Sequence, residues 1–124
     1  MPFKVLIIDD EPHILIMVAN RLRANGYETA TALSGARGLE FALRSKPDLI
    51  LLDSVMPEMP GEEVLYRIRQ DGELRGIPVI MLTADVKKTA VSEFRLRGAK
   101  EVVFKPFTPE ELLQTVRKVL GPAG

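Results

Sequence analysis

The feature that most limits the fold of this chain is a fivefold alternation between short apolar runs and longer helical patterns. Three of the runs are rich in Val, Ile and Leu, as strands covered on both faces are. Strand and helix alternating in this way predict a parallel sheet with helices on both faces, joined by right-handed crossovers. The second run mixes Thr and Ala with Tyr27 and is predicted to be an edge strand. The runs are Phe3–Ile8, Tyr27–Leu33, Asp48–Leu52, Pro78–Leu82 and Val102–Phe104.

The helical patterns between the runs carry signals for where helices begin. Pro12 stands at the first turn of the first helix, a position that proline favours. Ser34 is predicted to be the N-cap of the second helix, because its side chain can accept a bond from a free backbone N–H. Thr108, followed three residues later by Glu111, has the spacing of a capping box before the fifth helix. These signals agree with the strand–helix alternation.

The composition excludes several classes of function. The 124 residues suit one domain, with 17 Lys and Arg against 17 Asp and Glu, one His and no Cys. The absence of Cys excludes disulfides, thiolate metal sites and Cys nucleophiles, and a single His excludes His-rich zinc sites. A net charge of zero gives no sign of nucleic-acid or membrane binding, and no apolar run reaches the roughly 18 residues of a membrane span. We expect one cytoplasmic domain over residues 1–124, with 121–124 as a tail or the start of a linker.

Polar residues follow four of the five apolar runs at the point where each run ends. In a parallel sheet these carboxyl ends share one edge, and ligands of open α/β sheets bind outside that edge. Taken singly, each residue has a structural explanation, as a turn residue or a helix cap. Their joint occurrence favours a functional site at which they converge. They are Asp9, Asp10 and Glu11 after the first run, Asp53 after the third, Thr83 after the fourth and Lys105 after the fifth.

The chemistry of this set points to phosphoryl transfer. Carboxylates about 4 Å apart repel by roughly 4 kcal/mol at an effective dielectric constant near 20, so a proton or a cation must lie among them. A donor set of oxygens alone suits Mg²⁺. Lys105 supplies a positive charge for a phosphoryl oxygen, and Thr83 supplies a hydroxyl donor. Asp53, alone at the end of its strand, is free to act as a carboxylate nucleophile.

Four segments together resemble the receiver domain of two-component response regulators, the family that includes the single-domain chemotaxis regulator. The resemblance extends from about Lys4 to Leu120, and it is specific because all four segments occur in order. It implies an α/β fold, a (βα)5 doubly wound five-stranded parallel sheet of order 2-1-3-4-5 in a flavodoxin-like three-layer sandwich. The segments are VLIIDDEP (5–12), DLILLDSVMPEMPG (48–61), PVIMLTA (78–84) and GAKEVVFKPF (98–107).

The resemblance implies a phosphorylation site and a metal site. Asp53 would accept a phosphoryl group from a sensor histidine kinase or a histidine phosphotransfer protein. Asp10, Asp53 and the backbone carbonyl of Val55 would bind Mg²⁺ directly, while Asp9 would act largely through water. The cofactor implied is therefore Mg²⁺.

The remaining roles that the resemblance implies concern the switch. Lys105 would contact the incoming phosphoryl group, and Thr83 would move to bond the new phosphate and pull the following loop. A cis peptide bond before Pro106 is also common in the family. The signal would be read on the face made by the fourth helix, fifth strand and fifth helix, by a downstream protein or a C-terminal effector domain. The protein would be a switch and not an enzyme, without nucleic-acid or membrane contact, as a monomer or a weak phosphorylation-dependent dimer.

Two positions depart from the family's common pattern. Val102 stands where the family often has Tyr or Phe, the partner of the switch threonine. Valine cannot make the same large inward and outward swing, and Phe104, two residues later on the same strand face, is a candidate substitute. Pro60 replaces the frequent Asp before Gly61, which stiffens that loop.

Three other readings of the sequence remain open at this stage. A phosphatase of the haloacid dehalogenase type also uses a strand-end Asp, but it needs a second Asp two residues later, where this chain has Val55. A flavodoxin-like FMN carrier needs a Ser/Thr/Gly-rich phosphate loop after the first strand, where Asp9, Asp10 and Glu11 would repel a phosphate. An inert pseudo-receiver used as an interaction module is the third.

Overall fold

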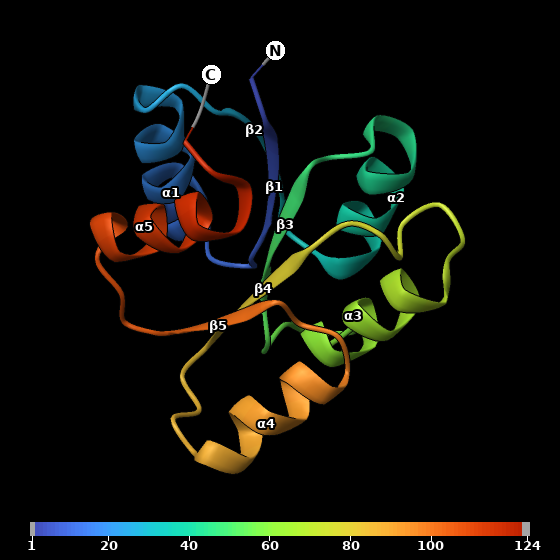
Figure 1. The fold of residues 1–124 in the computed structure, drawn as a ribbon. Helices are drawn as coiled ribbons and strands as arrows, with labels where there is room; N and C mark the ends of the chain where they lie inside the picture. Colours follow the sequence, from blue (N-terminus) through green and yellow to red (C-terminus); the bar gives the residue numbers. More distant parts are fainter. Residues whose placement is uncertain (1, 123–124) are drawn as a thin grey trace.

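The structure, a computed structural model, describes residues 2–122, which form five strands and five helices in strict alternation (Figure 1). The strands are β1 (Lys4–Ile8), β2 (Glu28–Ala32), β3 (Leu49–Asp53), β4 (Val79–Thr83) and β5 (Glu101–Phe104). The helices are α1 (Pro12–Ala24), α2 (Gly35–Ser45), α3 (Gly61–Gln70), α4 (Lys88–Leu96) and α5 (Pro109–Leu120).

The five strands form one parallel sheet in the order β2-β1-β3-β4-β5, which confirms the predicted fold and the edge position of β2. The register pairs Ile8 of β1 with Leu52 of β3, and Asp53 of β3 with Leu82 of β4. Each strand coincides with a predicted apolar run to within a residue or two at its ends. The difference matters at β3 and β4, because their final residues are Asp53 and Thr83. These polar side chains are therefore positioned by the sheet and not by a loop.

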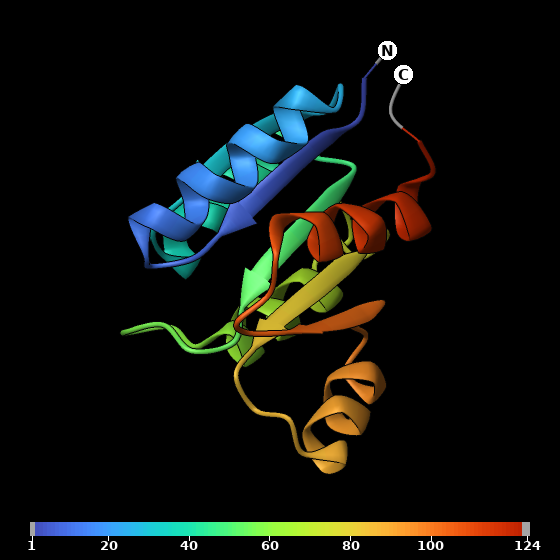
Figure 2. The ribbon, with the colours of Figure 1, turned by 90° about the vertical axis from the view of Figure 1, so that its left-hand side faces the viewer.

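Helices cover both faces of the sheet in three layers (Figures 1 and 2). Alternate residues of a strand point to opposite faces, so Val5 and Ile7 join the core under α1 and α5. Leu6 and Ile8 join the core shared with α2, α3 and α4. All four side chains are fully buried. Burying one Val, Leu or Ile side chain contributes roughly 1.5–3 kcal/mol, so the two cores fix the positions of the strand ends.

Both predicted N-caps are present. The Oγ of Ser34 accepts a hydrogen bond from the backbone N–H of Arg37 at the start of α2 (3.2 Å). The Oγ1 of Thr108 accepts one from the backbone N–H of Glu111 at the start of α5 (3.1 Å). Each bond satisfies one of the amide groups that a helix leaves free at its first turn.

The predicted tail, 121–124, falls partly outside the described residues, which end at 122. Gly121 follows α5 and its carbonyl oxygen accepts a hydrogen bond from the hydroxyl of Tyr27 (3.0 Å). This contact joins the end of α5 to the start of β2. Within residues 2–122, no helix has the length and apolar character needed to cross a membrane.

Candidate functional site

Three carboxylates meet where β1 and β3 end. The two strands are neighbours, so the residues that follow Ile8 lie beside the last residue of β3. Oxygen atoms of Asp9, Asp10 and Asp53 all lie within 4.8 Å of one another. Asp9 is fully buried and Asp53 is 4% exposed, while Asp10 is partly exposed. The predicted convergence of these three residues is therefore present in the structure.

The ammonium group of Lys105 lies against the acidic cluster from the end of β5. Its Nζ is 2.8 Å from Oδ2 of Asp9 and 3.3 Å from Oδ1 of Asp53. A third carboxylate, that of Glu11, lies 3.4 Å away. The bond between Lys105 and Pro106 is cis, as the resemblance implies. One cation thus contacts carboxylates from two strand ends and from the loop that precedes α1.

The electrostatics of the cluster shift the pKa of its central groups. Burial and the neighbouring charge of Asp9 raise the pKa of Asp53 from 3.8 to about 6, against the opposing effect of Lys105 and the backbone N–H of Val55. Burial alone would lower the pKa of Lys105, but its hydrogen bond to Asp9 and the charges of Asp9 and Asp53 raise it overall. Lys105 is therefore charged at neutral pH, and Asp53 is ionised there as well, but at a cost that additional positive charge would reduce.

Thr83, predicted to join this site, is held by a different set of partners. Its Oγ1 accepts a hydrogen bond from the hydroxyl of Ser54 (2.9 Å) and another from the backbone N–H of Asp85 (3.1 Å). Both hydroxyl-bearing side chains are buried. Sequence reasoning did not single out Ser54, although a polar residue directly after Asp53 in a buried segment was an available signal.

Glu11 was grouped with the acidic residues but was not assigned a role in the site. Its contact with Lys105 places it at the rim of the cluster, with its side chain 47% exposed. The exposed imidazole of His13 lies 3.5 Å from the other oxygen of Glu11. The position of Glu11 beside two aspartates was the only sequence signal for this contact.

The loop between β3 and α3 is packed tightly against the backbone of the candidate phosphoacceptor. A Cβ atom on Gly61 would meet the carbonyl oxygen of Asp53 and would lie 2.8 Å from Cα of Ser54. The N–H of Gly61 donates to the carbonyl of Ser54 (3.1 Å), and Pro60 is the N-cap residue of α3. Glycine is required here because only a residue without a side chain permits this approach.

Val55, predicted to offer a backbone carbonyl to a metal ion, lies in the same loop. Its N–H donates to Oδ1 of Asp53 (3.4 Å), and its side chain is 75% exposed. On β5, Val102 packs against the core shared with α2, α3 and α4, while Phe104 is 40% exposed and pairs in register with Thr83. Val102, in register with Met81, and Phe104, in register with Thr83, therefore differ in burial.

The acidic cluster has the composition of a site for a hard cation. Its donors are carboxylate oxygens, which Mg²⁺ prefers, and they come from Asp9, Asp10 and Asp53. Three carboxylates within 4.8 Å face one ammonium group closely, so negative charge is left uncompensated. A divalent cation would relieve this repulsion, and the residues present therefore fit Mg²⁺.

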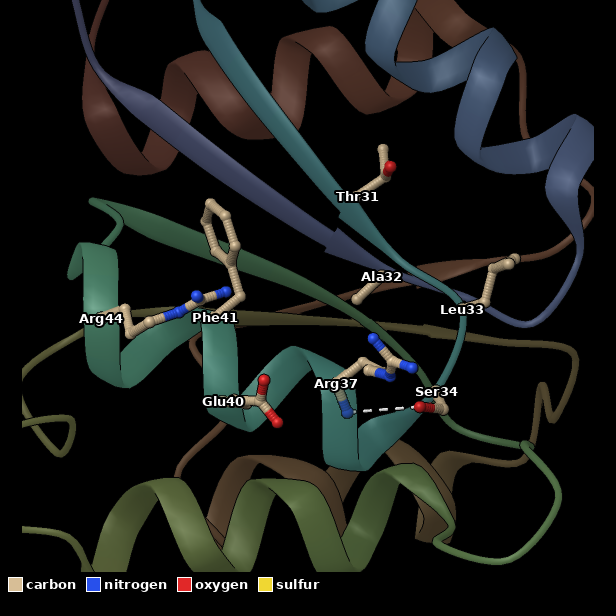
Figure 3. A pocket seen from close by; sticks show the side chains of 8 residues that line it. All are labelled: Thr31, Ala32, Leu33, Ser34, Arg37, Glu40, Phe41 and Arg44. Atoms are coloured by element: carbon tan, nitrogen blue, oxygen red, sulfur yellow. Dashed lines mark hydrogen bonds between the residues drawn. The ribbon is translucent and has the colours of Figure 1, made fainter.

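A separate groove lies along the edge strand, where β2 leads into α2 (Figure 3). It includes the Ser34 N-cap and shares no residue with the acidic cluster. We place the chemistry at the acidic cluster because the titratable groups converge there. The groove is lined by Thr31, Ala32, Leu33, Ser34, Arg37, Glu40, Phe41 and Arg44.

Known proteins share both the sequence and the fold. The polar-differentiation response regulator DivK of Brucella anthropi is 35% identical over 123 residues, covering 99% of this chain and all of that one. The transcriptional regulator RpaA of Synechocystis is 38% identical over 117 residues, which cover 94% of this chain but 48% of RpaA. The structure of the chemotaxis response regulator CheY4 of Vibrio cholerae superposes with a TM-score of 0.92 at 36% identity, covering 97% of this chain and all of CheY4.

The response regulator receiver domain family matches residues 5–117, which include Asp9, Asp10, Asp53, Thr83 and Lys105. Receiver domains are signalling switches of two-component systems, and the acidic cluster is compatible with phosphorylation and Mg²⁺ binding. Neither the phosphatase, the flavin carrier nor the inert module is favoured by these similarities. The chain belongs to the response regulator receiver domain family.

Proposed function

We propose that this chain is switched by transfer of a phosphoryl group onto Asp53 in a Mg²⁺-dependent reaction. The donor is the phosphohistidine of a sensor histidine kinase or of a histidine phosphotransfer protein. The observation that carries the proposal is the convergence of Lys105 with the carboxylates of Asp9 and Asp53 at the sheet edge. Membership of the receiver family supports the same assignment.

In the proposed step, a carboxylate oxygen of Asp53 attacks phosphorus, so that a P–O bond forms as the P–N bond to the donor imidazole breaks. The electrons of the P–N bond leave with the imidazole. The ring departs as a neutral molecule when its other nitrogen carries a proton. Lys105 lies close enough to Asp53 to contact a phosphoryl oxygen there, and it offsets the negative charge that arrives. Asp10, Asp53 and the carbonyl of Val55 would hold Mg²⁺, with Asp9 acting largely through water, and the ion would supply further positive charge for the phosphoryl oxygens.

Phosphorylation acts as a switch because it changes charge at one strand end. A phosphate monoester carries about −1.5 to −2 charges, and an acyl phosphate is of the same order. The new group bonds Lys105 and the hydroxyl of Thr83, contacts that only the modified protein makes, so it biases an equilibrium between two arrangements. The chain thereby acts as a phosphoacceptor and switch, not as a turnover enzyme.

The output surface in this proposal is the face formed by α4, β5 and α5. Helix α4 buries only Phe94 among its residues, so little packing opposes its movement. Leu96, the last residue of α4, is 86% exposed, and Val86, two residues before the helix begins, is 67% exposed. Such exposed apolar side chains suit a downstream protein or an effector domain, or a weak phosphorylation-dependent dimer.

Intact-mass measurement after treatment with acetyl phosphate tests the proposal. With Mg²⁺ present, the wild-type protein should gain the mass of one phosphoryl group, and chelation of Mg²⁺ should prevent the gain. The Asp53→Ala variant should gain nothing, while the matched Asp48→Ala variant, changed at the far end of β3, should behave as wild type. An undiminished gain in Asp53→Ala would place the acceptor elsewhere, and turnover of many generic phosphate substrates would favour a phosphatase.

A further inference from the structure

The hydrogen bond between Ser54 and Thr83 is buried and rigidly supported. Ser54 is 8% exposed and Thr83 is 2% exposed, with 2.9 Å between the two hydroxyl oxygens. The N–H of Ser54 donates to the carbonyl of Leu82 (2.9 Å), and its own carbonyl accepts from the N–H of Gly61 (3.1 Å). The backbone on both sides of Ser54 is therefore fixed, and its hydroxyl is held against that of Thr83.

Two hydrogen bonds to its hydroxyl oxygen hold Thr83 in its present position. A hydroxyl oxygen has two lone pairs, and those of Thr83 accept from Ser54 and from the N–H of Asp85. The carboxylate of Asp53 is occupied with other partners, since it accepts from the N–H of Val55 and pairs with Lys105. Among the hydrogen bonds formed within residues 2–122, none joins Thr83 to Asp53. In this arrangement Thr83 is bound to the neighbour of the phosphoacceptor.

We propose that Ser54 is a positioning residue that restrains Thr83 and thereby opposes its engagement with a phosphoryl group on Asp53. This inference rests on the proposed function, in which Thr83 bonds that group. The Ser54-bound arrangement of Thr83 keeps a buried hydrogen bond that the phosphoryl-bound arrangement gives up. A contact made in only one of two arrangements shifts the equilibrium between them by its own free energy. Ser54 would thus set how readily the switch responds.

A purely structural role for the hydrogen bond between Ser54 and Thr83 predicts a different result. If the bond only satisfied two buried hydroxyl groups, its removal would lower the stability of the fold without changing affinity for a phosphoryl mimic. If instead Ser54 aimed the Thr83 proton at the phosphoryl group, its removal would weaken binding. The restraint proposed here is the one role that makes binding tighter when the hydroxyl of Ser54 is removed.

Calorimetric titration with beryllium trifluoride, an anion that mimics a phosphoryl group on a carboxylate, tests this role in the presence of Mg²⁺. Ser54→Ala should bind the mimic about threefold to tenfold more tightly than wild type, the range set by one net hydrogen bond. In the Thr83→Ala background the same substitution should change affinity by less than about twofold, because Ser54 then has no hydroxyl to restrain. In the Thr83→Ser background, which keeps a hydroxyl, the increase should persist.

The matched control is Ser45→Ala, which removes a serine hydroxyl bonded to the carbonyl of Phe41 (3.0 Å) near the end of α2. It should leave affinity for the mimic unchanged. Unchanged or weaker binding of the mimic by Ser54→Ala would overturn the restraint, and so would an equal increase in affinity in the Thr83→Ala background. In either case, Asp53-dependent binding by the wild type would still support the proposed function. Failure of wild type to bind, or binding that Asp53→Asn retains, would overturn both.

Discussion

At the scale of single residues, Asp53 carries an electrostatic cost that follows from its surroundings. Its pKa in the folded protein is about 6, against 3.8 for the unperturbed group, because of burial and the nearby charge of Asp9. The unfolded chain therefore releases this proton at lower pH than the folded one does. The loss of folding stability caused by ionising Asp53 is absent below about pH 3.8, grows between pH 3.8 and 6, and is complete above pH 6. Perturbed pKa values of this kind cluster at functional sites, which supports the proposed role of Asp53 as the phosphoacceptor.

The first prediction follows directly from that cost. With divalent cations chelated at pH 7.5, Asp53→Asn should raise the free energy of unfolding by about 1–3 kcal/mol, since each unit of pKa shift corresponds to about 1.4 kcal/mol. Urea unfolding at a series of pH values measures it, and the gain should vanish near pH 4. Glu73→Gln, at a side chain 68% exposed, should change stability by less than about 0.5 kcal/mol. Destabilisation by Asp53→Asn at pH 7.5 would contradict the account.

A second prediction concerns Lys105, whose ammonium group compensates buried carboxylates. Replacing it with Met leaves the fully buried Asp9 without its partner at 2.8 Å. Removing one partner of a buried ion pair typically costs about 3–5 kcal/mol. With divalent cations chelated, Lys105→Met should therefore lower the free energy of unfolding by this order, as measured by urea unfolding. Lys118→Met removes an exposed partner of Glu101 and should cost less than about 1 kcal/mol. Equal losses in the two variants would show that the acidic cluster does not depend on Lys105.

At the scale of elements, the placement of α3 depends on one residue at its start. A side chain at Gly61 would collide with the backbone of Asp53 and Ser54, which cannot move aside because it belongs to the end of the sheet. Gly61→Ala should therefore destabilise the protein by about 1–3 kcal/mol, the usual cost of overpacking.

Thermal or urea unfolding measures this cost, and Gly72→Ala provides the control. A Cβ at Gly72 would have no heavy atom within 4 Å, so its substitution should be neutral or slightly stabilising. The pair separates crowding from any general effect of replacing glycine. Similar stability of the two variants would mean that the β3–α3 loop relaxes around the added methyl group.

Elements were the part of this protein that sequence predicted best, and the reason is periodicity. Apolar runs and helical spacings each depend on neighbouring residues, so all five strands were placed to within a residue or two at their ends. The convergence of Asp9, Asp10, Asp53 and Lys105 also followed, because parallel strands share one carboxyl edge.

Contacts between side chains from different strands were harder to predict. The bond from Ser54 to Thr83 joins residues 29 positions apart, and which rotamer brings the hydroxyls together depends on packing that no local pattern encodes. The hydrogen bond from Lys105 to Glu11 was equally hard to predict, since it joins residues 94 positions apart. The sequence thus predicted which strand ends form the site but not which side chains bond to one another.

At the scale of the whole molecule, the order of the strands connects the acidic cluster to the proposed output face. Strand β4 lies between β3, which carries Asp53, and β5, which belongs to that face. Thr83 at the end of β4 pairs in register with Phe104 at the end of β5. In the proposed function, a movement of Thr83 would therefore reach β5, beside α4 and α5, through the backbone ladder that joins β4 to β5.

The whole fold should also respond to Mg²⁺ in a way that depends on pH. A cation that binds only the folded protein stabilises it by mass action, by about 1.4 kcal/mol at tenfold excess over its dissociation constant. Binding requires ionised carboxylates, and Asp53 has a raised pKa of about 6. The increase in the urea midpoint on adding MgCl₂ should therefore be full above pH 7 and decline as the pH falls through 6. Asp10→Asn should weaken it, and NaCl at equal ionic strength should not reproduce it. A Mg²⁺ effect of equal size at pH 5 and pH 7.5 would place the ion away from Asp53.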